Sequence, residues 1–103
     1  MMRELYRRVV DFWPVHAHAW DAIDECSRLS ASVAVSLLRG RSSGAGLAAA
    51  IADMEVICER LRMIVGDGLV DIEKVESLQR LQGRLVQEEQ RVAALGEQSG
   101  DAP

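Results

Sequence analysis

Apolar residues recur at steps of three and four along most of the chain, the spacing of one face of an α-helix. From His16 to Leu38 this spacing predicts a helix whose apolar face carries Ile23, Cys26, Leu29, Val33 and Leu37. From Leu47 to Val65 the same spacing recurs in Leu47, Ile51, Met54, Cys58, Leu61 and Val65. These patterns predict two amphipathic helices joined by the loop RSSGAG at residues 41–46.

Two further helices are predicted, one on each side of this pair. The first runs from about Arg3 to Phe12 and is stopped by Pro14. The last begins at Asp71, a residue suited to an N-cap, and runs to about Leu95. Its apolar positions form an a/d seam with Glu88 at the one polar position, and they are Leu78, Leu81, Leu85, Val92 and Leu95. We therefore expect one all-α domain over residues 1–95, followed by a disordered tail at residues 96–103.

Composition agrees with an all-helical protein and excludes several classes. Of the 103 residues, 49% are hydrophobic and only 4% are aromatic, which favours aliphatic helices over a β-sandwich. The net charge of −4 gives no reason to expect binding to nucleic acid or to an anionic membrane. The chain contains no apolar run of the roughly 18 residues that span a bilayer, and its charged start does not resemble a signal peptide. We expect a cytoplasmic protein.

The two central helices carry more apolar residues than one face needs. Val35, Leu38, Ile57 and Ile64 lie off the main stripes. Surplus apolar surface on a small helical chain is commonly covered by another copy, so we expect a homodimer or a tetramer. The two cysteines, Cys26 and Cys58, lie within the apolar stripes and are expected to be buried, reduced thiols.

Acidic residues on the two central helices are the candidates for chemistry. Asp21, Asp24 and Glu25 lie near Arg28 on the first of these helices, and Asp53 lies on the second. Carboxylates three residues apart share a helix face and can hold one hard cation, and two antiparallel helices can present four oxygens to Mg²⁺. Two such ions can polarise a phosphoanhydride and activate water for in-line attack.

The amino-acid sequence of these segments resembles that of a known family. DECSRL at residues 24–29, SLLRGR at 36–41 and AIADMEVICERLRMIVG at 50–66 are similar to the phage-type MazG-like nucleoside triphosphate pyrophosphohydrolases. That family's pattern is E-E-C-x-E-L, then R-G-R/K, then E-E-I-A-D-V-E-I-x-x-E-x-L. The similarity covers about residues 20–85. It implies a four-helix all-α bundle completed by oligomerisation, and Mg²⁺-dependent cleavage of nucleoside triphosphates to the monophosphate and pyrophosphate.

The chain departs from the family at the implied metal site. The resemblance places the four ligand carboxylates at Glu25, Arg28, Ala50 and Asp53, so two of the four are missing. Glu25 and Asp53 are the residues that would hold Mg²⁺ if it is still bound, and Asp24 keeps a neighbouring charge on a shorter arm. We expect the Arg28 guanidinium to sit between Glu25 and Asp53 in place of the metal.

A plainer interpretation of the same residues is a solvated helix surface with an Asp24–Arg28 pair, which contributes about 0.2–0.5 kcal/mol. Arg39 and Arg41 match the family's R-G-R/K turn, where they would contact a phosphate, but an ordinary helix C-terminus explains them equally well. His16 and His18 are two residues apart, a poor spacing for a metal pair, and are interpreted as surface histidines.

Trp13 and Trp20 flank the histidines, and packing in the core or at a subunit interface is favoured over base stacking for them.

Three functions remain open from the sequence. The chain is a MazG-like homologue that has lost hydrolysis and keeps a nucleotide-binding or scaffold role. Alternatively, it is an active pyrophosphohydrolase with a metal site built from Asp21, Asp24, Glu25 and Asp53. In the third case it is a protein-interaction module of phage origin that binds a host or phage protein.

Overall fold

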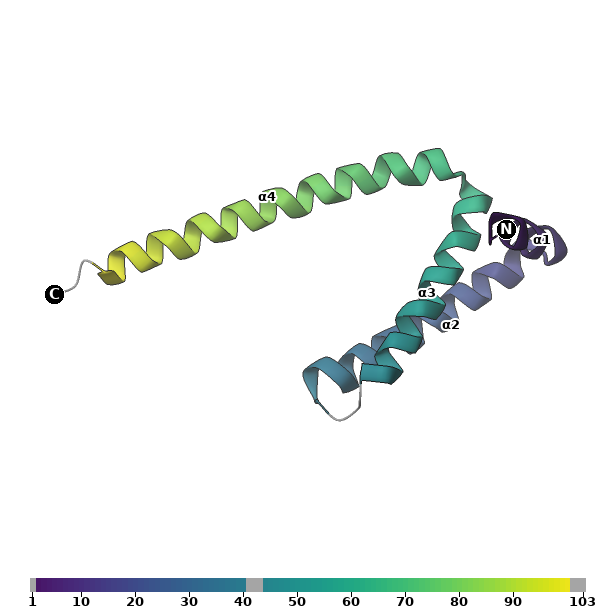
Figure 1. Ribbon diagram of the computed structural model, residues 1–103, viewed down its shortest axis with the longest axis horizontal. Coiled ribbons are helices and arrows are strands. Elements are labelled where there is room, and N and C mark those ends of the chain that lie inside the picture. Colours follow the sequence, from purple (N-terminus) through teal and green to yellow (C-terminus); the bar gives the residue numbers. More distant parts are fainter. Residues whose placement is uncertain (1, 41–43, 101–103) are drawn as a thin grey trace. The chain divides into compact units, whose positions relative to one another are not determined.

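The chain is built from helices. A computed structural model describes residues 2–40 and 44–100, and its helices are α1 (Met2–Phe12), α2 (Val15–Val33), α3 (Gly44–Val65) and α4 (Asp67–Gly100) (Figure 1). A π-helical turn, η1 (Ala34–Leu38), continues α2. These two described ranges contain no strand. The predicted all-α fold class is confirmed.

Pro14 separates the first two helices, as the sequence predicts. Its ring fixes φ at −68°, and with ψ at 160° the residue is extended. Ala17 starts the next turn by donating its N–H to the Pro14 carbonyl at 3.0 Å. On the other side of the break, the rings of Phe12 and Trp13 meet edge to face with centroids 4.9 Å apart. The proline thus ends α1 and opens α2.

The second helical segment ends at Leu38, where the sequence predicts its end, but its last turn is π-helical. Arg39 donates its N–H to the Ala34 carbonyl, five residues back, at 3.0 Å. Gly40 follows with φ at +62°, a left-handed conformation that costs a residue without Cβ little. The wide turn and the glycine together bring the segment to its end.

In the described chain, the most extensive packing between helices is that of α2 against α3 (Figure 1). The helices run antiparallel, since residues near the start of α2 contact residues near the end of α3. Buried and half-buried apolar side chains of α3 repeat at steps of three and four, as in Leu47, Ala50, Met54, Ile57, Leu61 and Ile64. Three side chains in the described ranges are buried, namely Ala50 and Ile57 at 2% exposure and His18 at 0%.

The predicted apolar stripes are partly wrong. Ile23 and Leu37 on the second segment are exposed in the single chain, as are Ile51 and Val65 on α3. On α3 the contact face is turned toward Ala50, Ile57 and Ile64, and it keeps Leu47, Met54 and Leu61 of the predicted stripe. On α2 it keeps Leu29 and Val33 of the predicted stripe and adds His18, Ala22 and Glu25.

The two cysteines also lie outside the α2–α3 contact. Cys26 and Cys58 are free thiols, but both are exposed in the single chain rather than buried. They lie on the stripes beside the α2–α3 contact, which is why the expected burial fails within one chain.

α4 begins and ends beyond its predicted bounds. It starts at Asp67, so Asp71 is not its N-cap, and it extends five residues past Leu95 to Gly100. The preceding residue, Gly66, has φ at +115° and separates α3 from α4 by itself. Residues 96–100 of the predicted tail are therefore helical, and residues 101–103 lie outside the described ranges.

The chain divides into two compact units, Met1–Asp67 and Gly68–Pro103. The first holds α1, α2, η1 and α3, and the second holds α4. Every residue from Asp71 to Glu97 is exposed in the single chain. The single domain predicted for residues 1–95 stays a prediction.

Replacing Ile57 by alanine tests how much of the fold rests on the α2–α3 contact. Ile57 is the largest apolar side chain buried there, so Ile57→Ala should lower the free energy of unfolding by about 2–5 kcal/mol. Urea denaturation followed by circular dichroism measures this. Leu38→Ala is the matched control, because Leu38 is 82% exposed and its loss should change stability by less than about 0.5 kcal/mol. Equal losses in the two variants would contradict the assignment of the core.

Candidate functional site

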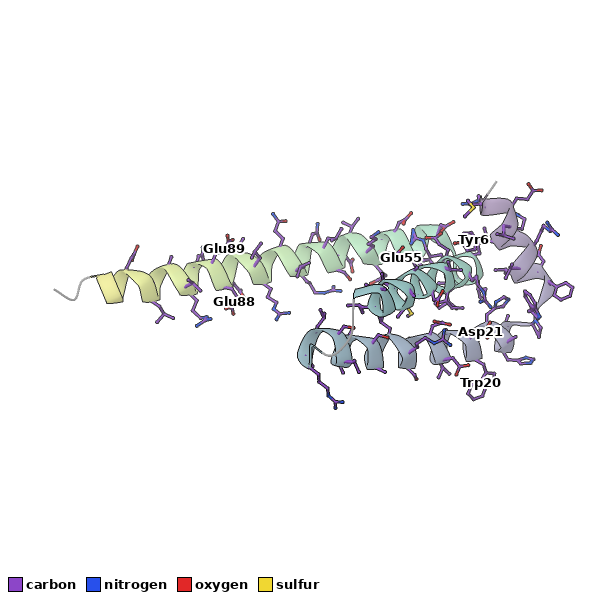
Figure 2. The ribbon with its side chains drawn as sticks, turned by 60° about the horizontal axis from the view of Figure 1, so that its bottom comes forward. Tyr6, Trp20, Asp21, Glu55, Glu88 and Glu89 are labelled. Atoms are coloured by element: carbon purple, nitrogen blue, oxygen red, sulfur yellow. The ribbon has the colours of Figure 1, made fainter. Side chains whose placement is uncertain are left out.

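One side of the α2–α3 pair gathers most of the acidic residues that the sequence singles out. An open groove of about 330 Å³ lies there, lined by Asp21, Glu25, Asp53, Val56, Ile57 and Arg60. Asp21 and Glu25 are one helical turn apart on α2 and therefore share a face. Figure 2 shows Asp21 on the side of α2 nearer α3. We call this feature the acidic groove.

Arg28 links the two helices at one end of the acidic groove. Its Nη1 lies 3.3 Å from Oε1 of Glu25, three residues earlier on α2, and 3.6 Å from Oδ2 of Asp53 on α3. The guanidinium therefore lies between Glu25 and Asp53, as expected from the sequence. Its side chain is 59% exposed, so both ion pairs are partly screened by water.

Ala50 and Asp24 do not line the acidic groove. Ala50 is buried in the contact between α2 and α3, one turn before Asp53. Asp24 is exposed and does not line the acidic groove. Among the described residues Arg28 pairs with Glu25 and Asp53 and forms no ion pair with Asp24, so the plainer Asp24–Arg28 interpretation is not observed. Of the six predicted pocket residues, the structure brings together Asp21, Glu25, Arg28 and Asp53.

The structure adds a polar contact that the sequence analysis missed. His18 is fully buried, so its interpretation as a surface histidine is wrong, whereas His16 is exposed as expected. Arg60 donates from Nε and Nη2 to His18 Nδ1, at 3.1 and 2.7 Å, and from Nη2 to Oδ2 of Asp21 at 2.8 Å. Because the guanidinium only donates, His18 Nδ1 must accept, and the imidazole proton sits on Nε2.

The sequence holds only part of the signal for this contact. His18 precedes Ala22 by four residues and Glu25 by seven, so all three share the helix face that packs on α3. A histidine on an inward face needs a polar partner, and Arg60 is a cation on the facing helix.

Two buried polar atoms in the described residues have no hydrogen-bond partner, Nε2 of His18 and Oε2 of Glu25. Such atoms are costly when left unpaired. The second belongs to Glu25, a residue that also lines the acidic groove.

The charges of the site do not make a magnesium centre. Three carboxylates (Asp21, Glu25 and Asp53) face two permanent guanidinium cations, Arg28 and Arg60. Within the described ranges, no three His, Cys, Asp or Glu side chains are arranged to hold a metal ion. Mg²⁺ needs near-octahedral oxygen ligation, and a guanidinium between two of the oxygens opposes it. The donor set that is present does not fit Mg²⁺.

The remaining candidates lie outside the acidic groove. Arg39 is exposed at the end of η1, and Arg41 lies outside the described residues. Trp13 and Trp20 are exposed in the single chain, so core packing is wrong for them, while an interface role remains a prediction. Figure 2 shows Trp20 on the side of α2 away from α3.

A second groove of about 320 Å³ lies between α1 and the end of α3. Its lining comes from α1 and the end of α3, and consists of Arg3, Arg7, Val10, Asp11, Met63, Gly66 and Asp67. Asp67 lies 3.3 Å from Arg3 and 3.3 Å from Arg62, which joins α1 to the end of α3. The ion pairs of Asp67 with Arg3 and Arg62 connect these helices.

No protein-family model, curated protein or solved structure matches this chain. In the described residues, no helix is both long and apolar enough to cross a membrane.

Replacing Arg60 by methionine tests the buried polar contact. Arg60→Met keeps much of the side-chain length but removes the donors to His18 Nδ1, so the variant should lose about 1–3 kcal/mol of unfolding free energy. Thermal denaturation measures the loss. Arg80→Met is the control, since the hydrogen bond that Arg80 donates to Ser77 is exposed. In a His18→Leu background the cost of Arg60→Met should shrink, and an undiminished cost would contradict the contact.

Proposed function

We propose that this chain is a MazG-like nucleoside triphosphate pyrophosphohydrolase homologue that has lost hydrolysis and acts as a homo-oligomeric scaffold. The observation that carries the proposal is the position of Arg28 between Glu25 and Asp53. These three residues stand at three of the four positions where the resemblance implies metal ligands. The fourth position is Ala50, which is buried and has no oxygen to offer.

The chemistry of this exchange argues against catalysis. Two carboxylates are lost and one cation is gained, which changes the local formal charge by about three units relative to the family pattern. A guanidinium stays protonated at any physiological pH. It can neutralise Glu25 and Asp53 and so preserve the helix pair, but it cannot activate water or supply a Lewis acid.

A retained nucleotide-binding role receives less support than a scaffold role. The acidic groove presents three carboxylates, which repel a triphosphate in the absence of a metal. Arg28 and Arg60 are already paired with those carboxylates. The active-enzyme alternative is favoured by one observation, the unpartnered Oε2 of Glu25. A bound cation would satisfy that atom, and the experiment below decides between the two functions.

Restoring both missing acids tests the loss of hydrolysis. The unaltered protein should release no pyrophosphate from a panel of nucleoside triphosphates with Mg²⁺ or Mn²⁺, and should show no Mg²⁺ binding by calorimetry. Arg28→Glu together with Ala50→Glu should gain Mg²⁺-dependent pyrophosphate release. Because two added carboxylates repel Glu25 and Asp53, Mg²⁺ should also raise the melting temperature of this variant and not that of the parent.

Arg28→Gln together with Ala50→Gln is the matched control, since it has similar side-chain volume without charge. It should gain neither hydrolysis nor stabilisation by Mg²⁺. Pyrophosphate release by the parent protein would overturn the proposal in favour of an active enzyme. No gain in the folded double-Glu variant would contradict a catalytic ancestry of the site.

The scaffold part of the proposal is supported by the opposite side of the α2–α3 pair. We call it the apolar side, and its members are Ile23, Cys26, Leu37, Ile51, Cys58 and Val65. All six are exposed in the single chain. On both helices they follow the contact face by about 100° in the same sense, which in an antiparallel pair brings them to one side. Two such sides packed together would form a four-helix bundle.

Burial within one chain favours this assembly. Three buried residues in the described ranges make a very small core for a chain of 103 residues. A second copy that covers the apolar side would bury six more side chains per chain without disturbing the acidic groove.

Placing a charge on the apolar side tests the assembly. The unaltered protein should run as a dimer or tetramer by light scattering at micromolar concentration. Ile51→Glu should shift it toward a smaller species, because a buried carboxylate without a partner is costly. Leu38→Glu, which lies outside the apolar side, should leave the mass unchanged. A monomeric parent protein would sink the scaffold proposal.

A further inference from the structure

α4 presents a second apolar surface that neither the acidic groove nor the apolar side uses. Its members repeat as Leu78, Leu81, Leu85, Val92 and Leu95, and we call them the α4 seam. All five are more than half exposed in the single chain. The spacing places Leu78, Leu85 and Val92 at the a positions of a heptad and Leu81 and Leu95 at d positions. This is the pattern of one strand of a coiled coil.

We infer that the α4 seam binds the α4 seam of a second copy of this chain, as a parallel, in-register coiled coil. Self-pairing places leucine on leucine at the a and d layers formed by Leu78, Leu81 and Leu85. Over the 17 steps from Leu78 to Leu95, the seam extends about 26 Å. Gly83 occupies an f position, the outermost point of the heptad, where a missing side chain costs no packing.

The charges beside the seam select the parallel orientation. Arg84 is a g residue and Glu89 is the e residue five positions later, so in a parallel pair Arg84 of each copy lies opposite Glu89 of the other. Two attractive pairs result. In an antiparallel pair that aligns Leu81 with Leu85, the two copies would instead place Arg84 opposite Arg84, which is repulsive.

Glu88, at the remaining d position, fits the same arrangement. Its Oε2 accepts hydrogen bonds from Nε and Nη2 of Arg91 in the same helix, at 3.1 and 2.9 Å. Arg91 thereby balances the charge that would meet its copy in a parallel pair. One polar layer within an apolar seam costs stability but fixes the register. Figure 2 shows Glu88 and the neighbouring Glu89 projecting from α4.

Other occupants of the seam lead to different observations. A different protein would leave the purified chain unpaired along α4, and the chain's own helices would cover the seam within a monomer. Neither accounts for the complementarity of Arg84 and Glu89 at g and e positions. The inference is independent of whether the acidic groove hydrolyses anything.

Engineered cysteines in the full chain test the pairing. In a Cys26→Ala, Cys58→Ala background, Leu78→Cys, Leu85→Cys and Val92→Cys should each form a disulfide with the same residue of a second copy. In a parallel coiled coil, equivalent a positions lie within the Cα distance that a disulfide spans. Gln90→Cys, at an outward f position, is the matched control. Paired thiols at micromolar protein should oxidise roughly a thousandfold faster than the control, because pairing raises their effective concentration to about millimolar.

Cross-linking no faster than the Gln90→Cys control at all three positions would overturn the inference. Cross-linking at Leu85→Cys alone would also overturn it, because it would indicate an antiparallel pair that crosses near that residue.

Charge reversal gives an independent readout on the same protein. In the Leu85→Cys protein, Arg84→Glu and Glu89→Arg should each slow cross-linking, and the double reversal should restore it. Arg80→Glu, at a c position, should leave the rate unchanged. If Arg84→Glu instead speeds cross-linking, the parallel orientation is overturned.

Discussion

The contact between α2 and α3 buries Ile57, Ala50 and His18, and the two sides of the helix pair take their positions from it. Ala50 lets the backbones approach, and Ile57 fills the space between them. His18 is held by Arg60, which also reaches Asp21. Because the helices meet on this narrow face, the acidic residues fall to one side and the apolar residues to the other. The acidic groove and the apolar side therefore both follow from the way α2 packs against α3.

The spacing of apolar residues was sufficient to predict where the helices lie. It was not sufficient to predict which face of each helix is buried. Pro14 and Gly40 marked ends that the structure confirms, because proline and glycine act on the backbone wherever they stand. The stripes were less certain, since Ile51 and Ile57 both follow three-and-four spacing with their neighbours. Spacing alone does not state which of two adjacent stripes meets the partner helix. That choice depended on Ala50, whose small side chain carries no strong hydrophobic signal.

The residues of the acidic groove were also predicted only in part. Arg28 lies between Glu25 and Asp53 as expected. Glu25 is one turn away on the same helix and Asp53 is on the facing helix, so the guanidinium can pair with both carboxylates. The His18–Arg60 contact was missed because it joins residues 42 positions apart. Only the register of α2 against α3 brings them together, and that register is a tertiary property.

The backbone conformation of Gly66 determines whether α3 and α4 are two helices or one. Its N–H still donates to the Arg62 carbonyl at 2.7 Å, so α3 is intact up to that atom, and the chain departs from the helix only through a φ of +115°. A residue with a Cβ would resist that angle and favour helical dihedrals instead. Residues 44–100 would then be free to form one uninterrupted helix. The break between α3 and α4 therefore depends on one backbone torsion, which a single substitution at Gly66 can change.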